Sequence, residues 1–205
     1  MKTVKFLFVL LFILSTPLQL FGRVTESAEN LLRIIHKVNR HWQENNSPQV
    51  RSFWDNAAYH TGNMEVYELT GNTAYLKYST DWAEYNHWKG AASDNKAEWR
   101  YGYGETPQYV LFGDWQCCFQ TYADLYGIRG DDRRIARARE VLEYQMGTDK
   151  NDYWWWADGL YMVMPVMTKL YRITKNPLYL EKLYEYFSYA DSVMYDPEAG
   201  LYYRD

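Results

Sequence analysis

Asp158 is the residue whose neighbours most clearly fit it for chemistry. It follows three consecutive tryptophans, Trp154–Trp156, and precedes an apolar run that continues to Met164. A carboxyl group at the mouth of an indole-lined pocket is costly to ionise, which makes it a candidate proton donor near neutral pH. Indole faces also suit the C–H faces of sugar rings. The alternative is structural, because an acid in the first turn of a helix interacts favourably with the helix dipole.

Three short segments of the chain resemble one another, and each is expected to end one helix and lead into a partner helix. They are Val66–Asn72, Leu125–Asp131 and Leu170–Asn176, and each has a tyrosine at its second position. Self-similarity of this kind indicates a repeat architecture, here built from helical hairpins.

Each repeat has an acid or an indole 12 or 13 residues before its tyrosine, at the start of its first helix: Trp54, Asp114 and Asp158. If the hairpins curl into a ring with the first helices inside, these starts converge and the two acids face one pocket. Glycosidic chemistry uses such pairs, since one carboxyl group moves a proton while the other supports charge or water. The alternative is that both acids only occupy helix starts, where acids are favoured.

The composition favours a glycan partner. The chain has 205 residues, a formal net charge of −4 and no basic stripe, which argues against a nucleic-acid partner. Aromatic residues make up 19% of the chain, which suits a cleft lined by Tyr and Trp rings with their polar O–H and N–H groups. The four histidines are scattered and the two cysteines, Cys117 and Cys118, are adjacent. We therefore predict no metal and no cofactor, and expect at least one buried cysteine.

Residues 1–22 are predicted to be a secretory signal peptide. Lys2 and Lys5 precede the apolar run Phe6–Leu14, and Ser15–Pro17 interrupts it. This run is shorter than a transmembrane helix requires, so a membrane anchor is the lesser alternative. We expect a periplasmic or secreted protein with no membrane association after cleavage.

Apolar residues recur at helical spacing along the remaining chain, which predicts an all-α protein. Helices are expected over Ser27–Asn45, Ser52–Thr70, Thr73–Trp88, Asp114–Tyr126, Asp131–Met146, Ala157–Thr174 and Pro177–Tyr195. Pro177 is expected at the first helical position. The long segment Lys89–Phe112 is predicted to be an irregular rim over a cleft. Only Leu201–Tyr203 has the alternation of a strand.

Four segments carry a family resemblance: Trp54–Tyr59 with Gly62, Asp114–Tyr122, Trp155–Met162 with Pro165, and Leu201–Asp205. In these segments the chain resembles the unsaturated glucuronyl and unsaturated rhamnogalacturonyl hydrolases, glycoside hydrolase families 88 and 105. The third segment is the most specific, with its tryptophan, acid, glycine, leucine, tyrosine and methionine in the family order. The resemblance implies an (α/α)6 toroid, a barrel of six helical hairpins. Residues 23–205 would then be its N-terminal half, truncated, and a half toroid should be marginal alone.

The resemblance also implies a hydrolase that removes the unsaturated uronic acid left at the non-reducing end by polysaccharide lyases. The reaction is hydration of the C4=C5 enol ether, with Asp158 moving the protons and Asp114 holding sugar hydroxyls and stabilising positive charge. The implied substrate contacts are Trp54, Trp156, Gln120 and Arg204, although a surface ion pair is an alternative for the arginine. Two other functions stay open: an inverting glycosidase on the same toroid, and a catalytically inactive glycan-binding fragment.

Overall fold

The computed structural model describes residues 27–204, which fall into two compact units divided between Ser47 and Pro48. The predicted signal peptide, residues 1–22, lies outside the described residues. In the first unit, residues 27–45 form one helix, as predicted, with exposed apolar side chains at Leu31, Ile34 and Val38. Among the described residues, no helix is both long enough and apolar enough to cross a membrane.

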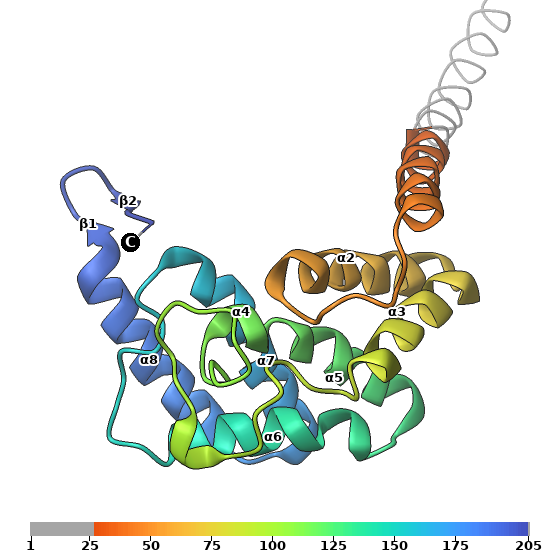
Figure 1. The fold of residues 1–205 in the computed structure, drawn as a ribbon. Coiled ribbons are helices and arrows are strands. Elements are labelled where there is room, and N and C mark those ends of the chain that lie inside the picture. The colour runs from red at the N-terminus through yellow and green to blue at the C-terminus, as the bar shows by residue number, and fades with distance from the viewer. Residues whose placement is uncertain (1–26, 205) are drawn as a thin grey trace, which may run out of the picture. The chain divides into compact units, whose positions relative to one another are not determined.

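The second unit consists of three consecutive helical hairpins (Figure 1). They pair α2 (Trp54–Thr70) with α3 (Thr73–Tyr85), α5 (Cys118–Arg129) with α6 (Arg133–Met146), and α7 (Ala157–Thr174) with α8 (Leu178–Met194). Short helices η1 (Lys96–Glu98) and α4 (Gly113–Gln116) lie between the first and second hairpins. The first helices α2, α5 and α7 contact one another in series, with α5 in the middle. The all-α prediction is therefore confirmed.

The described strands are β1 (Tyr195–Asp196) and β2 (Leu201–Tyr202), which pair antiparallel with Tyr195 opposite Tyr202. The turn between them contains Gly200 with a positive φ of 65°. Asp196 closes this turn, because its Oδ1 accepts hydrogen bonds from the backbone N–H groups of Glu198 and Ala199. The strand expected near Leu201–Tyr203 is thus present as half of a small hairpin.

The three turns inside the helical hairpins share one geometry. Each begins with a residue in the left-handed region, namely Gly71, Gly130 or Lys175, with φ of 66°, 53° and 60°. The N–H group of that residue donates to the carbonyl of the repeat's tyrosine, at 2.7, 2.6 and 2.8 Å respectively. This bond satisfies one of the carbonyls that the end of a helix leaves without a partner.

The residue after each left-handed position caps the following helix. Asn72, Asp131 and Asn176 each accept, through the side chain, a hydrogen bond from the N–H group two residues later, at 3.0, 3.1 and 3.1 Å. Asparagine and aspartate favour this position because a short side-chain oxygen can reach the free N–H groups at a helix start. The sequence repeat is therefore a repeated turn with a repeated cap.

Several predicted helix boundaries differ from the structure by a few residues. The helix expected over Asp114–Tyr126 is divided into α4 and α5 at Cys117, although Cys117 keeps helical dihedral angles. The helix expected to reach Trp88 ends at Tyr85, because His87 and Trp88 adopt positive φ values of 53° and 59°. This reversal buries the Trp88 indole beneath the guanidinium of Arg134, 4.9 Å away.

Pro177, expected at the first helical position, lies immediately before the start of α8 at Leu178 and already has helical dihedral angles. Its φ of −64° is the value that its ring imposes, so it still directs the chain into α8. The start predicted for α7 at Ala157 and its end at Thr174 are both confirmed.

Aromatic rings dominate the core of the second unit. Its largest fully buried side chains include Trp82, Trp154, Tyr122, Tyr153, Tyr179 and Tyr186. His60 lies among such rings, stacked on Trp82 with 3.9 Å between ring centroids and bonded through Nδ1 to Ser79. Burial lowers the pKa of His60 to about 3, so it is a neutral packing residue. Cys117 and Cys118 are both free and buried, as expected for at least one of them.

Candidate active site

The starts of α2, α4 and α7 surround one cavity of about 220 Å³. Aromatic rings form most of its wall, together with two carboxyl groups and one guanidinium: Trp54, Tyr103, Phe112, Asp114, Trp155, Trp156, Asp158, Met162 and Arg204. The structure therefore brings Asp114 and Asp158 together from different hairpins.

A second cavity of about 290 Å³ adjoins the first and shares Trp54, Asp158 and Met162 with it. Its other lining residues are Ala58, Cys117 and Tyr161. Asp158 is exposed and can be reached from both cavities. Trp54, which is 45% exposed, also lines both. These two residues therefore stand where the two cavities meet.

Asp114 is the more buried of the two acids. Its side chain is only 6% exposed, and Oδ1 has no hydrogen-bond partner. Burial, together with the smaller effects of the negative charges of Asp158 and Glu105, raises the pKa of Asp114 to about 6. The positive charge of Arg204 acts in the opposite direction. The sequence expectation placed the desolvated acid at Asp158, whereas the structure desolvates Asp114 more strongly.

The first turns of α2, α4 and α7 explain why acids occur at these positions. Phe53, Phe112 and Trp156 precede α2, α4 and α7 in extended conformation and provide no side-chain cap. Each helix instead has an acid at its second residue, where the helix dipole favours negative charge. The structural interpretation of Asp114 and Asp158 is thus compatible with a catalytic one. Asp55, the equivalent acid on α2, lies outside the cavity lining and 3.8 Å from Arg51.

The rim predicted over Lys89–Phe112 is fixed to the helices beneath it. The Arg137 side chain of α6 donates to the carbonyls of Ala91 and Ser93. Trp115 Nε1 donates to the carbonyl of Gly104 at 3.2 Å, next to the cavity-lining Tyr103. The rim therefore holds Tyr103 at the cavity through bonds to helices α4 and α6.

The aromatic rings with the most exposed surface at the cavity are not all among those predicted from the sequence. Trp156 is only 4% exposed and packs against Phe112 with 4.9 Å between ring centroids, so only part of it faces the cavity. Trp155 is half-buried and Tyr103 is exposed, so these two rings offer more surface to a sugar. Neither had been selected as a site residue. The run of three tryptophans was a signal for Trp155, whereas Tyr103 lies in an irregular segment with no periodicity to mark it.

Gln120 lies away from the cavity lining. It is 2% exposed, and its Nε2 donates to the carbonyls of Tyr161 and Met162 in α7, at 2.9 and 3.1 Å. Pro165, inside α7, has no N–H group with which to bond the Tyr161 carbonyl four residues earlier. Gln120 therefore supplies the donor that the proline removes, and it is not among the residues that line the cavity.

Arg204 lines the cavity beside the two acids. Its backbone carbonyl accepts a hydrogen bond of 2.7 Å from the Ala157 N–H group, one of those that the start of α7 leaves without an intrahelical partner. The segment after β2 is in this way joined to the helix that carries Asp158. This contact explains how a residue so far along the chain reaches the site.

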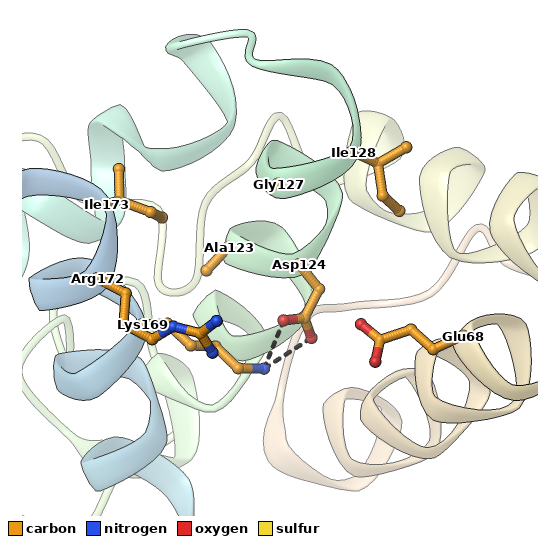
Figure 2. Close-up of a pocket in the computed structure, with 8 residues that line it drawn as sticks. All are labelled: Glu68, Ala123, Asp124, Gly127, Ile128, Lys169, Arg172 and Ile173. Atoms are coloured by element: carbon orange, nitrogen blue, oxygen red, sulfur yellow. Dashed lines mark hydrogen bonds and ion pairs between the residues drawn. The ribbon is translucent and has the colours of Figure 1, made fainter.

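A separate hollow of about 440 Å³ lies near the opposite ends of α2, α5 and α7 (Figure 2). Lys169 and Asp124 form an ion pair of 2.7 Å there, and Glu68 and Arg172 also line the hollow. Its remaining lining residues are small or aliphatic, so it lacks the aromatic rings on which sugars pack. The aromatic cavity with two acids is the better candidate for chemistry. Across the described residues, no group of three or more His, Cys, Asp or Glu side chains is placed to hold a metal ion.

Consecutive helical hairpins whose first helices contact one another and bring paired carboxyl groups to an aromatic cavity place the fold in the helical-toroid class. The chain belongs to Glycosyl Hydrolase Family 88, whose family model matches residues 28–205. It is 25% identical, over 158 residues, to the unsaturated 3S-rhamnoglycuronyl hydrolase of Formosa agariphila. That match covers 74% of this chain and 40% of the relative.

Two solved structures are much more similar to the chain. One is a glycosyl hydrolase family 88 protein from Bacteroides vulgatus, 71% identical with a TM-score of 0.85, for which the match covers 86% of this chain and 51% of that protein. The other is named as a polysaccharide lyase and is 70% identical, with a TM-score of 0.85 and coverage of 87% and 51%. The chain thus spans about half the length of these structures.

Proposed function

We propose that this protein removes an unsaturated uronic acid from the non-reducing end of oligosaccharides that polysaccharide lyases release. The observation that carries the proposal is the convergence of Asp114 and Asp158, from separate hairpins, on one aromatic cavity. Membership of Glycosyl Hydrolase Family 88 supports the reaction class. The name of the Formosa agariphila relative supports the type of sugar.

The proposed substrate fits the chemistry of the cavity wall. An unsaturated uronic acid has a ring flattened by its C4=C5 double bond, two faces that can pack on aromatic rings, and one carboxylate. Trp54, Trp155 and Tyr103 supply aromatic surface, and Arg204 supplies positive charge for the carboxylate.

The proposed reaction is hydration followed by ring opening. Asp158 donates a proton to C4, the double-bond electrons form the C4–H bond, and positive charge is left on C5 and the ring oxygen. Water adds at C5 while Asp158 takes its proton back. The hemiketal then opens at the bond between C5 and the ring oxygen, and the hemiacetal left at C1 releases the aglycone. Asp114 holds sugar hydroxyls and stabilises the developing charge.

The electrostatics of the cavity provide a proton near neutral pH. The negative charge of Asp158 at the same cavity favours retention of a proton on Asp114. The pKa of Asp114, raised to about 6 mainly by burial, brings this retention close to physiological pH.

The decisive experiment is an absorbance assay with the full gene product and lyase-digested polysaccharides. We expect loss of the ultraviolet absorbance of the conjugated double bond, and we expect Asp158→Asn to abolish it. Asp55→Asn is the matched control, because Asp55 has the equivalent helix position outside the cavity lining and should retain most activity. Turnover by the Asp158→Asn protein would remove Asp158 from its role.

The same assay separates the alternatives. A rise in absorbance on an intact uronic-acid polysaccharide would indicate a lyase, the activity named for one of the similar solved structures. Cleavage of saturated glycosides would favour an inverting glycosidase, which holds water between its two carboxyl groups. Binding of unsaturated oligosaccharides without turnover would indicate a glycan-binding protein. We further propose a periplasmic or secreted location, which N-terminal sequencing of the mature protein would test.

A further inference from the structure

We propose that Trp156 is a positioning residue whose indole ring acts as a spacer between the two acid-bearing helix starts and thereby sets the placement of Asp114 relative to Asp158. The effect of Trp156 on catalysis rests on the proposed function, whereas the position of its ring between the two helix starts does not.

Both acids have a glycine as an immediate neighbour, and both glycines face the same ring. Gly113 precedes Asp114, and a Cβ built on it would lie 3.0 Å from Cη2 of Trp156. Gly159 follows Asp158, and a Cβ built there would lie 3.2 Å from Cε2 and Cζ2 of the same indole. These distances are shorter than ordinary carbon–carbon contacts, so a Cβ at either position would require the ring or the backbone to shift by a few tenths of an ångström.

Conformational freedom does not explain these glycines. Neither Gly113 nor Gly159 has a positive φ, and both lie in the first three residues of a helix instead of in a turn that needs glycine. The requirement at both sites is therefore close approach of the ring. Gly62 in α2 offers a contrast, because a Cβ built there would meet nothing within 4 Å.

The ring itself has little freedom to move. Trp156 is the N-cap of α7, so its backbone is continuous with the helix that carries Asp158. Its indole packs against Phe112, the residue before α4, and a Cβ built on Gly113 would also approach Val163 Cγ2 at 3.3 Å. Because the ring is packed between two helix starts, an atom added between the ring and either backbone would change the distance between those helix starts.

The test compares Gly159→Ala and Gly113→Ala with the control Gly62→Ala in the full gene product. We expect each of the first two to lower kcat by about tenfold with KM changed little, because a displaced acid affects the transition state more than binding. We expect Gly62→Ala to keep wild-type kinetics. Trp156→Phe lacks the part of the indole that the glycines contact, so combining it with Gly159→Ala should recover part of the lost kcat.

A second measurement distinguishes this inference from the proposed function. The carboxyl carbon of Asp114 can be titrated by NMR without substrate, and its midpoint reports first the burial of the carboxyl group and then its distance from neighbouring charges. The charges that act on Asp114 are those of Asp158, Glu105, Arg204 and Asp55. Burial raises the pKa of the nearby Cys117 thiol to about 12, so it stays neutral in this range.

We expect the Asp114 midpoint to shift in Gly159→Ala and Gly113→Ala and to stay unchanged in Gly62→Ala. If the wild-type protein turns over no unsaturated sugar while these midpoints shift, the proposed function is wrong and the spacer role of Trp156 is supported. If both variants fold, keep the wild-type Asp114 midpoint and keep wild-type kcat, the spacer is refuted. Lower stability, an unchanged Asp114 midpoint and no recovery of kcat in the double variant would also refute the spacer role, because the glycines would then matter only for packing.

Discussion

At the scale of the residue, the two acids occupy equivalent positions in their helices but different environments. Asp114 is buried with an unpartnered oxygen, while Asp158 is exposed between two cavities. Sequence spacing identified both, because a carboxyl group at a helix start can be counted from a repeated tyrosine. It could not rank their burial, because Phe112, Trp156 and the fixed rim that cover Asp114 meet only in the folded chain.

The raised pKa of Asp114 predicts a pH dependence of stability. The folded protein binds its proton more tightly than the unfolded chain, so the stabilising contribution is complete below about pH 4 and is lost as pH rises through about 6. Asp114→Asn stays neutral at all pH values. We expect it to raise the free energy of unfolding at pH 8 by about 1–3 kcal/mol while having little effect at pH 4.

Urea unfolding at several pH values measures this effect. Asp94→Asn is the control of opposite sign, because a hydrogen bond from Lys89 lowers the pKa of Asp94 and its ionised form is the stabilising one. A constant difference between wild-type and Asp114→Asn proteins from pH 4 to 8 would contradict the prediction.

At the scale of the element, α7 depends on a residue outside it. Its periodicity and first-turn acid predicted both ends correctly, but the periodic pattern gave no account of Pro165 in its interior. Gln120 on α5 supplies the hydrogen-bond donor that Pro165 lacks, through two bonds to α7 carbonyls. These bonds could not be predicted, because local sequence does not show which helices become neighbours. The prediction that Gln120 contacts substrate rests on the family resemblance alone.

We expect Gln120→Leu to lower the free energy of unfolding by about 1–3 kcal/mol, because it leaves the Tyr161 carbonyl without a donor. In a Pro165→Ala background the alanine N–H group can bond that carbonyl within the helix. The same Gln120→Leu change should then cost about 1 kcal/mol less. Urea unfolding of the four proteins completes the cycle, and strictly additive effects would show that the two residues are not coupled.

At the scale of the whole molecule, the repeat determines the architecture of the second unit. The three hairpin turns were recognisable in the sequence because left-handed turns and side-chain caps restrict residue type, as Gly71-Asn72 and Gly130-Asp131 show. The division of the described residues after Ser47 was not predicted, since the first helix has the same amphipathic pattern as the others. Periodicity reveals that a helix has an apolar face, but it does not reveal what covers that face.

Lys175 is the exception among the three turns, because it holds a left-handed φ of 60° with a full side chain. We expect Lys175→Gly to raise the free energy of unfolding by about 0.5–1 kcal/mol, since relief of the left-handed strain outweighs the added freedom of the unfolded chain. The reciprocal change Gly71→Ala should lower it by about 1 kcal/mol. Chemical denaturation tests both, and a destabilised Lys175→Gly protein would show that the lysine side chain contributes more than its backbone costs.

The bond from Gln120 into α7 has a consequence for natural variation. A glutamine and a proline far apart in the chain complete a single helix, so selection acts on them jointly. Family members that lack the proline should be free to carry apolar side chains at the glutamine position, whereas members that keep the proline should keep a donor there. An alignment of many members would reveal this linked inheritance without any experiment on the protein.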